Sequence, residues 1–262
     1  MDIFGFDSLS FMSFLLTLIR VSLIVFLLPF FGGETIPTTV KAALAIVLTM
    51  AIWPDLSLRG EAFPAHPANI VMLIIGEALL GLLMGAMVHF IFAGIQLGGQ
   101  IIGFQMGFSM LTFADPSSGT QLVVTAFLAQ TVGMAIFLAL DGHLYLLSAL
   151  MGSFKLVGPG QFYLSIASLG DLIQMSGQMF SLAAKIAGPL IGCLFMIDLA
   201  LALMARAAPQ MNLLMIGFPL KIGMGMFLFG IMFTLISLFF DEFINGIGPM
   251  FDNIMRTVRA PL

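Results

Sequence analysis

Long apolar runs, separated by short polar or proline-bearing stretches, dominate the 262-residue chain. A transmembrane helix needs about 20 consecutive, mostly apolar residues, and several runs reach or approach that length. Barrel strands would instead alternate between apolar and polar residues over about 10 positions, and the runs show no such alternation. The pattern therefore predicts an all-α integral membrane protein, with apolar runs at about residues 9–31, 39–53, 70–95, 122–140, 142–151, 180–204 and 211–240.

Prolines and polar residues between the runs predict where helices begin and where loops lie. Pro37 stands just ahead of the second run, in the position of a helix start. Residues 54–69 and the VGPGQF segment from residue 157 have the composition of loops. The C-terminal end is amphipathic and finally basic, which favours a cytoplasmic C-terminus. With no linker, repeat or low-complexity tract, we expect one domain over residues 1–262.

The composition sharpens the prediction of a membrane protein. The chain is 60% hydrophobic and 8% charged, whereas a soluble domain carries about 25% charged residues. So few charges cannot cover a water-facing surface, so most of the outside must face lipid or other apolar subunits. The chain has no basic patch of the kind that binds nucleic acid.

Charged residues inside the apolar runs are costly in lipid and are therefore candidates for a function. They are scattered and form no histidine–carboxylate chain of the kind that relays protons. Salt bridges within the chain or contacts with other subunits explain them better, and both explanations stay open. The candidates are Arg20, Glu77, Lys185, Asp198 and Arg206.

Catalytic chemistry finds little support in the residues. His66, His89 and His143 are isolated, and no spacing among them suits a metal. The single Cys193 offers neither a disulfide nor a metal-ligand pair. No nucleophile, metalloprotease or phosphate-loop motif is present. We expect no enzymatic activity, no metal and no cofactor.

The segment GGQIIGFQMGFSMLTFADP, residues 98–116, is unusually rich in glycine and polar residues for such an apolar chain. Glycines at four-residue spacing share one helix face, where another backbone can approach closely. Close packing of this kind is one interpretation of the glycines; the other, which stays open, is that glycine weakens the helix and leaves the stretch 98–107 only partly helical. The Met and Phe residues that follow suit either an ordinary core or a deformable plug ended by Asp115-Pro116.

The same segment carries a resemblance to a known family. GQIIGFQMGFSMLTFADPSS (99–118) resembles the signature of the FliR family of flagellar protein-export gate subunits, whose virulence counterpart is the T-type component of type III secretion systems. DGHLYLLSAL (141–150) and DLALALMARAAPQMNLLMIGFPLKIGMG (198–225) are similar to two further family segments. LIRVSLIVFLLPFFGGETIPTTVKAALA (18–45) matches the family pattern of an early arginine, an Ile-Pro and a lysine. The resemblance covers nearly the whole chain.

The resemblance implies a non-enzymatic subunit built of long helical hairpins, part of which lies outside the bilayer plane. It would assemble with P-type and Q-type subunits (FliP and FliQ), and with FlhB-type and FlhA-type components, at the flagellar basal body in the bacterial inner membrane. Unfolded flagellar proteins would pass through the gate. Carried over residue by residue, the family's pore plug comprises Gln105, Met106, Gly107, Phe108, Ser109, Met110, Leu111, Thr112, Phe113, Ala114, Asp115 and Pro116.

Two alternatives remain open at this point. The chain could serve the equivalent gate of a virulence secretion system, or, with less support, it could be a secondary transporter of small molecules. A transporter would also contain broken helices and intramembrane charges, but it should show a repeat between its halves, and none is visible in the sequence.

Overall fold

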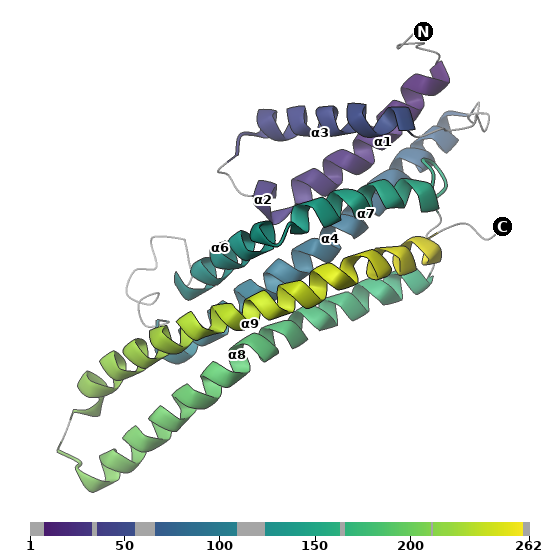
Figure 1. Ribbon diagram of the computed structural model, residues 1–262. Coiled ribbons are helices and arrows are strands. Elements are labelled where there is room, and N and C mark those ends of the chain that lie inside the picture. Colours follow the sequence, from purple (N-terminus) through teal and green to yellow (C-terminus); the bar gives the residue numbers. More distant parts are fainter. Residues whose placement is uncertain are drawn as a thin grey trace. The chain divides into compact units, whose positions relative to one another are not determined.

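The computed structural model describes residues 8–32, 36–55, 66–108, 124–162, 166–210 and 212–258, and these residues are helical apart from short connections. Helix α3 begins directly after Pro37, as the sequence predicts. The elements, drawn in Figure 1, are α1 (Ser8–Leu27), α2 (Pro29–Gly32), α3 (Thr38–Ile52), a 3-10 turn η1 (Trp53–Asp55), α4 (Pro67–Met106), α6 (Val124–Ala139), α7 (Gly142–Leu156), α8 (Ile166–Ala207) and α9 (Leu213–Thr257).

Among the described residues, four helices are long and apolar enough to cross a membrane, and a fifth span results if α6 and α7 cross as one bent pair. The four are α1, α4, α8 and α9. The chain is therefore an all-α integral membrane protein, which confirms the fold class predicted from the sequence.

Contacts divide the chain into two compact units whose segments interleave along the sequence. Helices α4, α8 and α9 each contribute one end to the first unit and the other end to the second. The prediction of a single domain over residues 1–262 stays a prediction. Unit 1 comprises Met1–His89, Asp141–Met175 and Phe243–Leu262, and unit 2 comprises Phe90–Leu140 and Ser176–Glu242.

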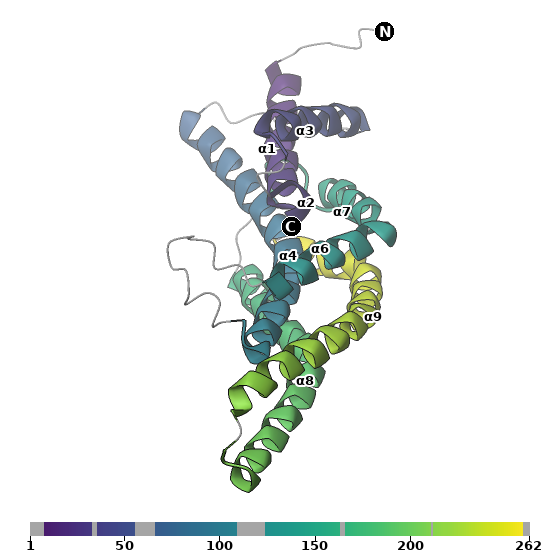
Figure 2. The same ribbon diagram turned by 90° about the vertical axis from the view of Figure 1, so that its left-hand side faces the viewer.

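In unit 1, α3 packs across α1, as Figure 1 and Figure 2 both show. The Trp53 indole N–H donates to the Ser13 hydroxyl at 2.9 Å, and its ring meets Phe14 edge-on. Helix α4 approaches α1 through Gly81, where an added Cβ would lie 3.1 Å from the Arg20 carbonyl oxygen. Gly81 therefore marks a close approach of the two helices, where a side chain would force its neighbours to shift.

In unit 2, the parts of α8 and α9 run side by side, as Figure 1 and Figure 2 show, and an aromatic cluster of Phe92, Phe137 and Phe240 fills the core, with ring centroids 5.4–5.6 Å apart. Helix α6 lies directly against α4 at Gly99. An added Cβ there would stand 2.8 Å from the Thr125 carbonyl oxygen, and the Thr125 hydroxyl donates to the Gly99 carbonyl at 2.8 Å.

The structure decides between the two interpretations of residues 98–107 and shows helices longer than the apolar runs. The stretch 98–107 is not partly helical, because α4 continues without a break through Met106, a length of 40 residues. The glycines act as close-packing positions, and neighbouring helices hold the backbone in place. Helices α8 and α9, with 42 and 45 residues, extend far beyond the apolar runs 180–204 and 211–240.

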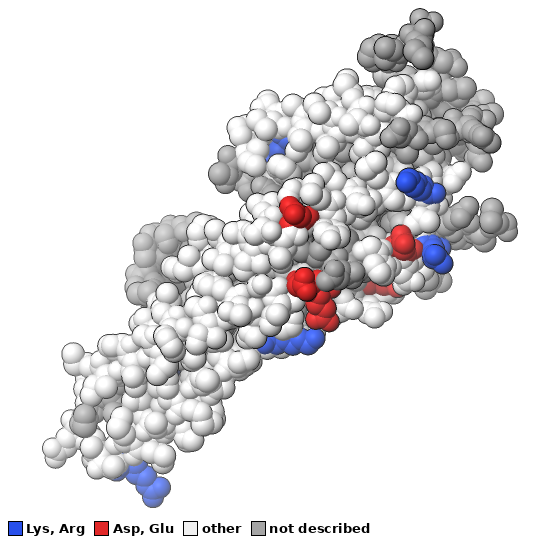
Figure 3. All heavy atoms as spheres, in the orientation of Figure 1, with Lys and Arg blue, Asp and Glu red and all other residues white. Residues whose placement is uncertain are grey.

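Large apolar side chains cover much of the outside of the chain. On the face in Figure 3, charged residues are few and widely scattered over an otherwise uncharged surface. Exposed apolar residues include Met72, Ile173, Met215 and Phe227, each at least 67% exposed. A surface of this kind suits lipid or the apolar surfaces of other subunits, and not water.

Candidate functional site

The first group of interest is a buried ion pair in unit 1. Arg20 on α1 donates from Nε to Glu77 Oε2 at 2.6 Å and from Nη2 to Glu77 Oε1 at 2.9 Å, and both side chains are fully buried. This fork-to-fork geometry is the strongest form of an arginine–carboxylate contact. It joins α1 to α4 at the point where Gly81 lets the two helices approach closely.

Neutral groups complete the surroundings of the ion pair. Arg20 Nη1 donates to the Val157 carbonyl at 3.0 Å and to the Ser153 hydroxyl at 3.3 Å. The guanidinium lies over the Phe154 ring, 4.2 Å from its centroid. The Gly160 amide donates to Glu77 Oε1 at 2.7 Å. The pair therefore ties α1, α4, α7 and the loop after α7 together, which gives it a structural role within the unit.

The second group lies in unit 2 at the C-terminal end of α4, the start of the segment predicted as a plug. Met106 is fully buried and packs beside Gly225 of α9, where an added Cβ would lie 2.7 Å from Met106 Cγ. Gly107 then leaves the helix with φ +93°, a conformation that favours glycine, and its Cα faces the Phe218 ring. The end of α4 is therefore packed firmly against α9.

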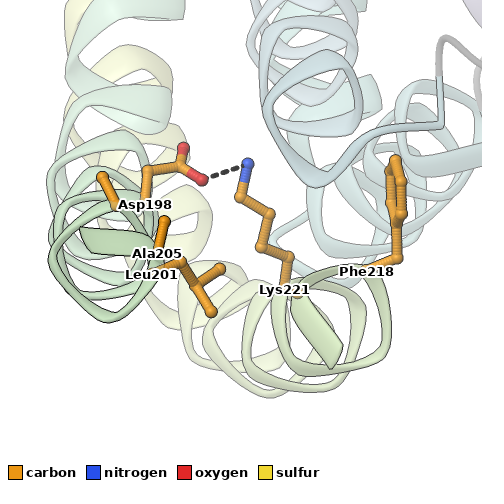
Figure 4. A pocket seen from close by; sticks show the side chains of 7 residues that line it. Asp198, Leu201, Ala205, Phe218 and Lys221 are labelled. Carbon is orange, nitrogen blue, oxygen red and sulfur yellow. Dashed lines mark ion pairs between the residues drawn. The ribbon is translucent and has the colours of Figure 1, made fainter. Parts of the chain in front are cut away.

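Polar contacts reinforce this attachment. Gln105 Nε2 donates to Asp198 Oδ2 on α8 at 3.2 Å, and Lys221 Nζ on α9 lies 2.5 Å from Asp198 Oδ1. The carboxylate thus links α4, α8 and α9. Figure 4 shows Lys221 reaching across from α9 to Asp198. Beside the ion pair lies a mainly apolar pocket of about 270 Å³, lined by Asp198, Leu201, Ala202, Ala205, Gly217, Phe218 and Lys221.

Comparison with known proteins identifies the family of this chain. Residues 11–247 match the family described as bacterial export proteins, family 1. The chain belongs to this family. It is 32% identical to the flagellar biosynthetic protein FliR of Escherichia coli (strain K12), over 91% of this chain and 90% of that protein. It is 30% identical to FliR of Pectobacterium carotovorum subsp. carotovorum, over 92% of each chain. FliR of Bacillus subtilis (strain 168) is 29% identical, over 81% of this chain and 82% of the relative.

The export protein brings only some of its predicted site residues together. Arg20 and Glu77 form one pair, and Asp198 pairs with Lys221. Lys185 and Arg206, in contrast, are exposed, so the chain itself does not bury them. Their role as subunit contacts stays a prediction. Of the predicted plug, Gln105 and Met106 end α4, Gly107 and Phe108 form the turn after it, and residues 109–116 lie outside the described residues.

Sequence reasoning missed two residues that the structure brings to these sites. Lys221 stands in an apolar run as Asp198 does, so its charge was a usable signal. Ser153 accepts from Arg20, but a serine inside a helix carries no sequence signal for such a contact. Among the described residues, no group of three or more His, Cys, Asp or Glu side chains could hold a metal ion.

Proposed function

We propose that this export protein is a non-enzymatic channel subunit of the flagellar protein-export gate, through which unfolded flagellar proteins leave the cytoplasm. The observation that carries the proposal is the family match over residues 11–247, together with the flagellar relatives aligned over most of their length. A component of an export apparatus works together with other components. The specific partners that we propose are the P-type and Q-type subunits, followed by FlhB-type and FlhA-type components, in the bacterial inner membrane.

The exposed apolar surface supports assembly with such partners. Chain-internal packing leaves Val47 on α3 and Leu203 on α8 more than 60% exposed, together with many other large apolar side chains. Lipid can cover part of this surface and apolar subunits the rest. Lys185 and Arg206 would then find their hydrogen-bond partners across subunit contacts or in water.

We further propose that residues 105–116 include the plug of the closed channel. Its base would be the end of α4, which Met106, Gly107 and the Gln105–Asp198 hydrogen bond attach to the α8–α9 hairpin. Met and Phe side chains in the segment 109–116 would seal by many weak dispersion contacts, which a passing chain can displace one by one. The firm base would let the plug move without disturbing the packing of α4.

Complementation tests the function. A flagellated strain that lacks its own copy is supplied with this chain, and secreted flagellar proteins and swimming are measured. We expect both to be restored. Normal assembly of the chain with P-type and Q-type subunits, without any secretion of flagellar proteins, would contradict the proposal.

A deletion of residues 109–116 tests the plug. This deletion keeps Met106 and Gly107, whose packing supports the end of α4. We expect the gate to assemble in normal amounts and to leak small ions, measured as ion flux into vesicles that contain the purified complex. An equally long deletion in the polar loop, residues 57–64, is the control and should stay tight. An ion-tight complex after the deletion of 109–116 would show that the segment is not the plug.

A further inference from the structure

The Asp198–Lys221 ion pair in unit 2 is less enclosed than the Arg20–Glu77 pair in unit 1. The Arg20 and Glu77 side chains are fully buried, whereas Lys221 and Asp198 keep 19% and 34% of their side-chain surface exposed. Both also line the pocket of about 270 Å³ between α8 and α9, which leaves them room to separate. The second pair is therefore suited to an adjustable contact more than to holding the fold together.

Asp198 uses one carboxylate oxygen for each of two neighbouring helices. Lys221 Nζ on α9 contacts Oδ1, and the Gln105 amide donates to Oδ2 at 3.2 Å. Figure 4 shows the Asp198 and Lys221 side chains reaching toward each other from α8 and α9. Gln105 is the last residue but one of α4, which ends at Met106. The lysine thus fixes the carboxylate in the place from which it accepts a hydrogen bond from the end of α4.

The end of α4 and the turn after it form one piece. The Gly107 amide donates to the Phe104 carbonyl at 3.1 Å. The Phe108 amide donates to the Gly103 carbonyl at 3.0 Å. These two bonds close the turn in the manner of a glycine helix cap. A contact that orients the last helical turn therefore also sets the direction in which the chain continues.

Apolar and polar contacts do different work on this piece. Met106 is fully buried beside Gly225 of α9, which fixes the position of the helix end. Apolar contacts depend little on direction, whereas a hydrogen bond requires donor and acceptor to be aligned. The bond from Gln105 to Asp198 is therefore the contact that opposes rotation of the helix end relative to α8.

We propose that Asp198 and Lys221 are positioning residues, which fix the direction in which the chain leaves α4 and thereby keep the closed channel ion-tight. The inference rests on the proposed function, because the end of α4 is the base of the proposed plug. Loss of the pair should leave assembly intact, since partly exposed ion pairs contribute little to stability. It should instead raise the fraction of gates with a displaced α4 end by about two- to fivefold.

Three variants test the contact in the purified complex with P-type and Q-type subunits. Asp198→Ala removes both interactions, Lys221→Met leaves the carboxylate without its orienting ammonium, and Gln105→Leu removes only the hydrogen bond. We expect normal amounts of complex and an ion flux into vesicles that rises about two- to fivefold. Hydrogen exchange of the amides of residues 104–108, followed by mass spectrometry, should accelerate in parallel.

Asp171→Ala is the matched control. Asp171 lies near the opposite end of the same helix and accepts a hydrogen bond from Thr257 Oγ1 at 3.2 Å, the same distance as the Gln105–Asp198 bond. The control therefore removes an equivalent contact from α8 without touching the end of α4. Ion flux and the exchange of residues 104–108 should stay at the parent values.

Exchanging the charges separates positioning from a merely structural role. Asp198→Lys/Lys221→Asp keeps an ion pair, and the Gln105 amide can turn over and accept from the ammonium. We expect this double variant to be as ion-tight as the parent. Gln105→Glu should then act in opposite directions: beside the native carboxylate it should leak, and beside the ammonium of the exchanged pair it should stay tight. Loss of packing alone would give no such reversal.

The proposal fails if Asp198→Ala stays ion-tight, if the exchanged pair does not restore the seal, or if Gln105→Leu blocks assembly, which would assign the contact to folding. The deletion of residues 109–116 distinguishes these outcomes from failure of the proposed function. A leak after that deletion, together with tight Asp198 and Lys221 variants, would reject the positioning role alone. A deletion complex that stays tight would reject the plug, and the positioning role with it.

Discussion

Removing the carboxylate of the buried ion pair should destabilise the protein strongly. Glu77→Ala deletes the acceptor of three hydrogen bonds, from Arg20 Nε at 2.6 Å, Arg20 Nη2 at 2.9 Å and the Gly160 amide at 2.7 Å. Arginine remains charged in proteins, so the variant keeps a fully buried guanidinium with only two neutral acceptors, Ser153 and Val157. Breaking one side of a buried ion pair costs about 3–5 kcal/mol.

The double variant Arg20→Met/Glu77→Leu separates the cost of a stranded charge from the net value of the pair. It removes both charges and fills the space with apolar atoms of similar size. Replacements of this kind are often close to neutral. We therefore expect the double variant to be more stable than Glu77→Ala, with only the unpaired Gly160 amide and the Val157 carbonyl left to find other partners.

Thermal unfolding of the purified protein in detergent measures the difference. At roughly 2–4 °C per kcal/mol for a chain of this size, Glu77→Ala should lower the Tm by about 6–20 °C. The control is Asp198→Asn, which breaks a pair whose carboxylate side chain is 34% exposed. Exposed pairs contribute at most about 1 kcal/mol, so that Tm should fall by only a few degrees.

Two results would refute this reasoning. A Tm of Glu77→Ala within a degree or two of the parent would mean that water reaches Arg20 once the carboxylate is gone. A double variant as unstable as Glu77→Ala would mean that the pair itself, and not the stranded charge, carries the stability.

Two further predictions concern the backbone. Gly99→Ala should lower the Tm by an amount that corresponds to about 1–3 kcal/mol, because its Cβ would stand 2.8 Å from the Thr125 carbonyl oxygen. The control, Gly188→Ala, meets no atom within 4 Å and should be neutral or slightly stabilising. Equal Tm values for the two variants would contradict the close approach of α4 and α6. Asp141, between α6 and α7, has the left-handed φ of 56°, which a β-branched residue adopts only with strain. Asp141→Val should therefore destabilise the protein by about 1–2 kcal/mol, whereas Asp141→Gly should be tolerated. A valine variant with an unchanged Tm would argue against the left-handed conformation.

Much of the helical architecture was predictable from the sequence, but the helix lengths were not. Apolar runs located every long helix, and Pro37 marked the start of α3. The runs were cut where polar residues begin, yet α8 passes through Asp171 and Gln178 without a break. Polar side chains change which surface a helix can face, and they do not end it. For the glycines before Met106 the sequence allowed both close packing and partial helicity, and the structure shows close packing in an unbroken helix, because packing outweighs their weak helix propensity.

Most charged residues at the two sites could be recognised from the sequence, but the ion pairs that they form could not. Arg20 and Glu77 are each conspicuous in an apolar run, yet they lie 57 residues apart, and no local pattern connects them. Asp198 was recognised as a charge without its partner Lys221, because the antiparallel arrangement of α8 and α9 decides which residues meet. Hydrophobic periodicity reports the face of a helix, whereas pairing depends on how helices align along one another.

The buried arginine also affects how the protein is inserted into the membrane during its synthesis. Helix α1 leaves the ribosome with Arg20 in the middle of its apolar sequence, and an arginine at such a position opposes insertion into the bilayer by about 2.5–3.5 kcal/mol. Its carboxylate partner is synthesised 57 residues later, and its last acceptor, Val157, 137 residues later. At about 5–20 residues per second, the first delay lasts roughly 3–11 s and the second roughly 7–27 s. Until then Arg20 lacks the groups that compensate its buried charge, so the final packing of α1 against α4 and the end of α7 is a late event in membrane insertion.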